Sequence, residues 1–144
     1  MIRLHARLAS LDANDWALLR RAFVTLVRIR LAMWMQPWHR LANSTAKIPV
    51  VRERPAPDRV AWAVGVTSRA VPRATCLTQA LALHRLLSHH GYSAIVQVGV
   101  SNVDKRFTAH AWVEHEGQSL LGTPEDVARY SRFFSWPTSR LEQP

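Results

Sequence analysis

The spacing of apolar residues predicts one long helix near the start of the chain. Between Ser10 and about Met35 these residues recur as on one helix face, with Ser10 or Asp12 as the cap and Pro37 as the stop. The apolar positions are Trp16, Leu19, Phe23, Leu26, Val27 and Ile29. The interrupting charges are Arg20, Arg21, Arg28 and Arg30. We expect an amphipathic arm that packs on its own domain, the alternatives being docking on a partner and lying on a membrane surface.

A proline-rich stretch follows and predicts a boundary. Residues 43–57 contain three prolines and a charged run, which favours an extended connector. Asp58 is then expected to cap a short helix that ends at about Ser68. The predicted organisation is a helical arm over residues 1–45, a linker over residues 46–57 and a core over residues 58–144.

A second helical pattern begins at Cys76 and ends at about His90. Gly91 can adopt the left-handed backbone that closes helices, and Thr75 is the expected N-cap. One side of this helix is expected to be buried, with Leu77, Ala80, Leu81, His84 and Leu87. The opposite side is expected to carry Thr78, Ala82, Arg85 and His89.

Alternating apolar and polar residues predict two strands after this helix. The first covers residues 93–100, and a polar turn leads to the second at residues 107–114. Because successive side chains of a strand point to opposite faces, His110, Trp112 and Glu114 should share one face of the second strand. The expected fold class is α+β, with a small antiparallel sheet.

Composition limits the class of protein. At 144 residues, 48% of them hydrophobic, the chain has room for one modest core. Its single cysteine cannot form an internal disulfide, and a tetrahedral zinc site would need histidines almost alone, so we expect no metal, no cofactor and a reducing cytoplasm as the setting. There is no run of about 18 apolar residues and no secretory signal, so neither a membrane span nor export is expected.

The net charge of +9, from 19 Lys and Arg against 10 Asp and Glu, favours acidic partners. Charge alone does not distinguish nucleic acid, anionic lipid and acidic peptide. A basic surface that is simply solvated explains it equally well.

Cys76 and His110 are the candidate chemical residues. At the first position of a helix, unpaired backbone N–H groups and the helix dipole favour a thiolate, and an amide there can bind an oxyanion. An imidazole on a neighbouring strand can serve as its base. The alternative is that Cys76 is an inert buried residue and His110 a structural one.

Two sequence blocks resemble the leader peptidases of lasso-peptide biosynthesis, the transglutaminase-like B2 proteins. The blocks are CLTQALAL at residues 76–83 and AHAWVE at residues 109–114, with a strand ending VGV at residues 98–100 between them. The resemblance covers about residues 58–122. It implies a papain/transglutaminase-like cysteine peptidase core, with a small antiparallel sheet packed on the helix of Cys76, in addition to the N-terminal arm.

The resemblance also implies a reaction and partners. Cys76 would be the nucleophile and His110 the general base, and the substrate would be a precursor peptide cut between its leader and core. A separate PqqD-like leader-recognition protein would present the leader, and an asparagine-synthetase-like cyclase would use the freed amine. No nucleic acid is expected as a partner.

One position departs from the family pattern. The family often has an aspartate twelve residues after the histidine, where this chain has Gly122. A three-residue loop at residues 115–117 would pair Glu114 with Gln118 and bring Gly122 opposite His110. We assign no third catalytic residue, although Glu125 and Asp126 follow closely. This departure leaves open a non-catalytic peptide- or nucleic-acid-binding module, and the transglutaminase relationship leaves open acyl transfer to an amine.

Overall fold

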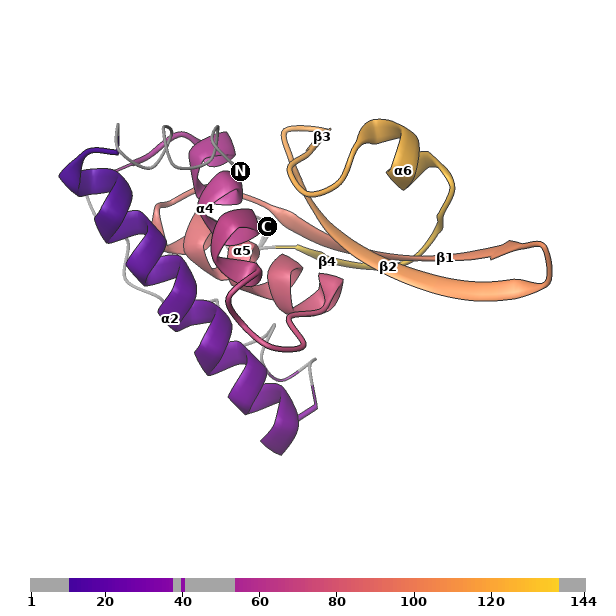
Figure 1. Cartoon of the computed structure of the whole chain (residues 1–144). Coiled ribbons are helices and arrows are strands. Elements are labelled where there is room, and N and C mark those ends of the chain that lie inside the picture. The colour runs from indigo at the N-terminus through magenta and orange to yellow at the C-terminus, as the bar shows by residue number, and fades with distance from the viewer. Residues whose placement is uncertain (1–10, 38–39, 41–53, 138–144) are drawn as a thin grey trace, which may run out of the picture.

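The structure, a computed structural model, describes residues 11–37, 40 and 54–137. Most of the predicted connector and linker lies outside these residues. Three helices form one side of the molecule and a four-stranded sheet the other (Figure 1). In chain order the elements are α2 (Ala13–Met35), α4 (Pro57–Ser68), α5 (Cys76–His89), β1 (Ile95–Val103), β2 (Arg106–His115), β3 (Gln118–Ser119), α6 (Pro124–Ala128) and β4 (Ser131–Pro137). The predicted α+β class and the antiparallel sheet are confirmed.

The predicted long helix is α2, and its start is set locally. Asp12 caps it: the Asp12 carboxylate accepts a hydrogen bond from the Asp15 amide at 2.8 Å. In return, the Asp15 carboxylate accepts one from the Asp12 amide. Its buried face carries Leu18, Leu19, Ala22, Leu26 and Ile29. The spacing also places Trp16 and Phe23 in the predicted apolar stripe, but their exposed fractions are 55% and 41%. They lie outside the stripe that α4 and α5 cover.

The short helix α4 starts two residues earlier than predicted. Asp58 is not its cap: Ala56 holds that position without a side-chain hydrogen bond, and Pro57 is the first helical residue. Proline suits that place because its φ is already helical and its missing N–H would have no partner there. Asp58 instead places its charge in the first turn, which the helix dipole favours.

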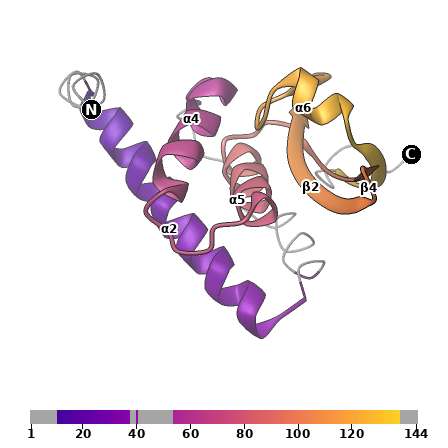
Figure 2. The same ribbon diagram turned by 45° about the vertical axis from the view of Figure 1, so that its right-hand side comes forward.

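Helix α5 is central, and this corrects the prediction of an exposed side. Thr78 and Ala82 are fully buried, because α2 and α4 pack on one side of α5 and the sheet packs on the other (Figure 2). The Thr78 hydroxyl lies 3.6 Å from the Met33 sulfur of α2. The predicted bounds of α5 are confirmed, with Thr75 as N-cap and Gly91 at a φ of +79°.

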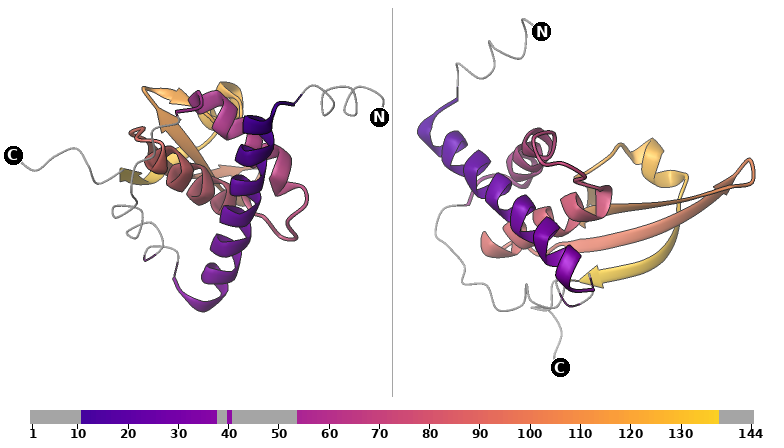
Figure 3. Two further views of the ribbon diagram at one scale, coloured as in Figure 1. Left: turned by 90° about the vertical axis from the view of Figure 1, so that its left-hand side faces the viewer. Right: turned by 60° about the horizontal axis from the view of Figure 1, so that its bottom comes forward.

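The sheet has the order β3-β2-β1-β4, and every pair is antiparallel. Strands β1 and β2 extend beyond their predicted limits into a long hairpin (Figure 3). Its turn consists of Asp104 and Lys105, both with positive φ. The sequence did not predict α6 or the edge strand β4.

The second hairpin differs from the prediction by one residue. Glu114 pairs with Ser119 and His115 with Gln118, so the predicted three-residue loop is wrong. The turn consists of Glu116 and Gly117, at φ values of 50° and 78°. Positive φ at both central positions characterises two-residue hairpin turns that match the strand twist.

Candidate active site

Cys76 lies half-buried at the first turn of α5. The Thr75 hydroxyl accepts a hydrogen bond from the Thr78 amide at 3.4 Å, and the Thr75 carbonyl accepts one from the Gln79 amide at 3.0 Å. The amides of Cys76 and Leu77 have no backbone acceptor within the described part of the chain. These N–H groups are the unsatisfied donors of a helix start, so they remain available to an anion beside the thiol.

His110 lies on β2, opposite Gly99 of β1, and its side chain is half-buried. The prediction that it shares a face with Trp112 is confirmed: the two rings are inclined by 20°, with centroids 6.1 Å apart. A second aromatic residue, Tyr130, has its ring centroid 5.3 Å from that of His110. Aromatic neighbours therefore hold the imidazole.

Gly99 allows this packing. A Cβ atom there would come within 2.8 Å of the Trp112 ring and 2.7 Å of the Tyr130 Cβ. Such distances are far below van der Waals contact, so a larger residue would displace Trp112 or Tyr130. Glycine at this point of β1 lets both rings approach the strand beside His110.

Glu114 fixes the indole of Trp112. Its carboxylate accepts hydrogen bonds from Trp112 Nε1 at 3.0 Å and from Gln97 Nε2 at 3.3 Å. Arg132 of β4 donates to the same carboxylate at 2.7 Å. Because Trp112 is fully buried and stacks on His110, Glu114 acts on the imidazole through the indole.

Gly122 lies beside the imidazole, as expected, although the hairpin register differs. A Cβ atom at Gly122 would be 3.6 Å from His110 Nε2 and 3.9 Å from a Val127 methyl group. The φ of Gly122 is +84°, a conformation that L residues rarely adopt. Among the described residues, no carboxylate forms a hydrogen bond with His110.

The two acids that follow do not supply that carboxylate. Glu125 and Asp126 lie in the first turn of α6 and are exposed. Asp126 already forms hydrogen bonds with Thr123. Its carboxylate accepts one from the Thr123 hydroxyl at 2.9 Å, and its backbone amide donates one to the oxygen of that hydroxyl at 3.2 Å.

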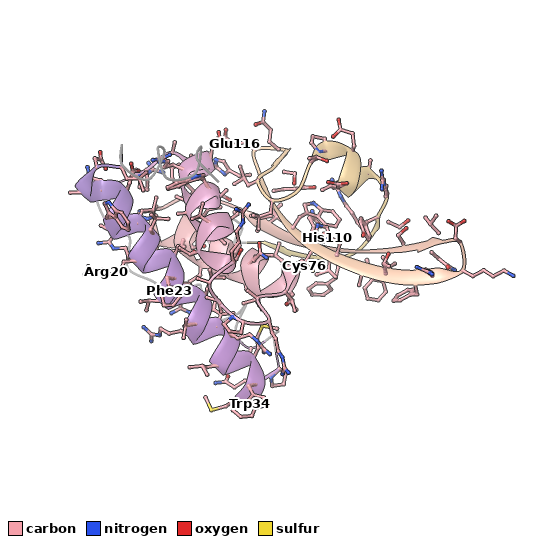
Figure 4. All side chains as sticks on the ribbon, viewed as in Figure 1. Arg20, Phe23, Trp34, Cys76, His110 and Glu116 are labelled. Carbon is pink, nitrogen blue, oxygen red and sulfur yellow. The ribbon has the colours of Figure 1, made fainter. Side chains whose placement is uncertain are left out.

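The fold brings the two predicted residues to one region. Helix α5 packs against β2, and in the view of Figure 4 the side chains of Cys76, at the first turn of α5, and His110, on β2, project onto the same region. No hydrogen bond joins the thiol to the imidazole in the part of the chain that the structure describes. A base of this kind often closes on its nucleophile only when substrate binds.

Sequence reasoning missed Gly99, Tyr130 and Arg132. Gly99 and Trp112 belong to the sequence blocks that resemble the family, but the sequence does not show that they pack together. That packing depends on Tyr130, which follows the unpredicted helix α6. Arg132 lies on the unpredicted strand β4. Only the alternation that put Glu114 on the face of His110 was available as a signal.

His84 is a buried histidine with a structural position. It is fully buried on α5, and burial lowers its pKa to about 4, which a backbone hydrogen bond with Ala94 partly opposes. It is therefore neutral at neutral pH.

The described residues contain no group of three or more His, Cys, Asp or Glu placed to hold a metal, and none of their helices could cross a bilayer.

Comparison with known proteins identifies the family. The family profile described as Transglutaminase-like superfamily matches residues 23–135, from within α2 to β4. That range includes Cys76, His110, Gly122 and the aromatic residues around the imidazole. No curated protein and no solved structure matches the chain. Members of this superfamily are typically cysteine-dependent and act as peptidases or acyltransferases. Since the profile covers most of the sequence and the helix-and-sheet arrangement agrees with it, the chain belongs to the transglutaminase-like superfamily.

Proposed function

We propose that this protein is a cysteine peptidase with Cys76 as nucleophile and His110 as general base. One observation carries the proposal: the single thiol lies at the capped start of a helix that packs against the strand of His110, in a transglutaminase-like chain. The half-buried position leaves the thiol accessible to a peptide.

The reaction would proceed in two stages. His110 takes the proton of the thiol while the sulfur attacks the carbonyl carbon of the scissile bond and the C–S bond forms. As the C–N bond breaks, the imidazolium gives that proton to the leaving amine. The same ring then takes a proton from the water that attacks the thioester. It returns this proton to the sulfur as the C–S bond breaks, which releases the acid and restores the thiol. The amides of Cys76 and Leu77 are the donors suited to the oxyanion of both stages.

The surroundings of His110 suggest which ring nitrogen acts. The space beside Gly122 faces Nε2, where an orienting acid would bind, and this leaves Nδ1 for the thiol. Trp112 and Tyr130 would take over the orientation of the ring. Thiols are better nucleophiles than hydroxyls, so such a site tolerates the lack of a carboxylate better than a serine triad would.

The proposed substrate is a ribosomally made lasso-peptide precursor. The blocks at residues 76–83 and 109–114 support this, since they resemble the leader peptidases of that pathway. Cleavage between leader and core would free the amine that a separate asparagine-synthetase-like enzyme cyclises. A PqqD-like protein would present the leader.

Incubation with a synthetic precursor, with and without the recognition protein, tests the proposal. When the unmutated protein is used, mass spectrometry should detect separate leader and core peptides. Cys76→Ala should lower the cleavage rate at least about a thousandfold while precursor binding stays unchanged. Cleavage by Cys76→Ala at the parent rate would exclude the proposed nucleophile.

Two other functions are distinguished by the same experiment. Superfamily membership favours acyl transfer to an amine as a second candidate, which would give a crosslinked product instead of two peptides. The glycine at residue 122 favours a non-catalytic binding module, which would bind precursor and release no product under any condition.

A further inference from the structure

A groove runs between α2 and α5, on the side of α5 that faces away from the sheet. It consists of adjoining cavities of about 400 and 180 Å³ that share Val24, Thr25 and Arg85. The first is also lined by Arg20, Arg21, Leu86 and His89, and the second by Arg28, Ile29 and Ala32. We call this the α2–α5 groove; the two helices pack directly on each other.

The groove gathers positive charge. Four arginines line it, and none of the described residues that line it is Asp or Glu. Burial, and then the charge of Arg28, lower the pKa of Arg85. An anion in the groove would be attracted by the exposed guanidinium groups of Arg20, Arg21 and Arg28, which can form charge-assisted hydrogen bonds with it.

The groove also has apolar walls, formed by Val24, Ile29 and Leu86. From Arg20 to Ala32, α2 rises about 18 Å, which matches about five residues of an extended peptide. A chain with carboxylate and apolar side chains fits this combination of charge, apolar wall and length.

The groove extends toward the end of α5 that carries Cys76. Arg20 and His89 line one cavity, whereas Met33 contacts Thr78, so α2 and α5 run in opposite directions. Arg85 lies about 14 Å along the helix from Cys76 and on its opposite side. A path along and around α5 would be about 21 Å long, and because α2, α4 and the sheet cover this helix, a peptide that reaches both positions passes outside them and needs at least about seven extended residues.

We propose that the α2–α5 groove binds an acidic segment of the peptide substrate, at least about seven residues from the bond that Cys76 cleaves. The identity of the ligand as substrate rests on the proposed function, whereas binding of an acidic peptide does not require cleavage. The two proposals can therefore fail separately.

Binding is measured with the full chain carrying Cys76→Ala. The probe is a fluorescent peptide of about ten residues that alternates Glu with Leu, a length that exceeds the groove. Its anisotropy should rise with protein concentration, and raising ionic strength from about 0.05 M to about 0.5 M should weaken binding. A matched peptide with Gln in place of Glu should bind at least about tenfold more weakly.

Paired variants locate the site. Arg20→Gln with Arg28→Gln should weaken binding about tenfold, since both side chains are exposed and contribute charge to the groove. The control, Arg106→Gln with Arg129→Gln, removes the same charge from exposed positions on β2 and next to α6 and should leave binding unchanged. Equal losses in both pairs would show a general field effect and overturn the groove.

Other results also decide between the proposals. Binding to phosphatidylglycerol vesicles with the same arginine dependence, together with no peptide binding, would assign the surface to lipid and overturn the inference. If the peptide binds through Arg20 and Arg28 but no precursor is cleaved, the proposed function fails and the groove stands. If cleavage occurs and its KM is unchanged in the groove variant, the groove fails and the peptidase stands.

Discussion

His110 is held by rings and by a carboxylate that does not touch it. Trp112 and Tyr130 lie against the imidazole, and Glu114 accepts the indole N–H at 3.0 Å. In a triad the orienting acid binds the histidine directly. Here Gly122 occupies that place, so the orientation of the base depends on the packing of these rings.

Glu114→Ala should therefore lower both stability and activity. The buried indole N–H would lose its acceptor, which costs about 1–3 kcal/mol in the free energy of unfolding. We expect precursor cleavage to fall about tenfold, mainly in kcat, because the ring under His110 is no longer fixed. Urea unfolding and cleavage kinetics measure the two effects. Glu116→Ala is the control, since its side chain is 85% exposed, and an equal effect there would refute the role of Glu114.

Gly122→Asp should increase cleavage about tenfold by placing a carboxylate beside Nε2. The positive φ costs about 1–2 kcal/mol in stability, which Asp and Asn tolerate better than other residues. Gly122→Asn has the same backbone cost without the charge. Comparing kcat of the two variants isolates the carboxylate, and identical rates would mean that the acid cannot orient His110.

At the scale of elements, the register of β1 against β2 places Gly99 next to His110, and the segment after α6 brings Tyr130 onto the same face. Helix α5 supplies Cys76 from the other layer and is covered on both sides. The site therefore depends on how tightly the rings pack on β1.

Two glycine substitutions test this packing. Gly99→Ala should lower the free energy of unfolding by about 1–3 kcal/mol and reduce cleavage, because its Cβ would lie 2.7 Å from Tyr130 Cβ. Gly65→Ala is the control: it lies inside α4, and no atom of its described neighbours comes within 4 Å of the added Cβ, so it should raise stability by about 0.5–1 kcal/mol. Thermal unfolding measures both, and a neutral Gly99→Ala would contradict the close approach.

At the scale of the whole molecule, one core joins the three helices to the sheet. Leu26 of α2, Val64 of α4, Leu83 of α5 and Val113 of β2 belong to it and are fully buried. His84 is buried where α5 meets the chain before β1. Because all these elements share one core, protonation of His84 affects unfolding of the whole chain.

Stability should fall as the pH drops from about 6.5 to about 4. Burial lowers the pKa of His84 to about 4, against 6.5 in the unfolded chain, so the unfolded chain takes up the proton first. The contribution of neutral His84 is complete above pH 6.5, and about 3 kcal/mol is lost by pH 4. Urea unfolding at several pH values measures it. His84→Gln should remove this dependence and His89→Gln should not; an unchanged slope in His84→Gln would exclude His84 as the source.

Several features followed from the sequence because their causes are local. Thr75 and Asp12 cap the helices that follow them, and Gly91 ends α5 with left-handed backbone. Alternation along β2 placed His110 and Trp112 on one face, because adjacent side chains of a strand point in opposite directions. The same local rules put Cys76 at the first position of a helix.

Other features depended on contacts between distant segments, which no local rule contains. Thr78 and Ala82 are buried because α2, about fifty residues earlier, packs over them, and Tyr130 meets His110 because β4 returns to β1. Gly122 reached the imidazole through a hairpin one residue shorter than expected. The sequence by itself determined the local positions of the thiol, at the first turn of a helix, and of the imidazole, on one face of a strand, since caps and periodicity act within a few residues. Only the tertiary structure decided which aromatic rings and charges surround them, since packing selects among faces that the sequence leaves equivalent.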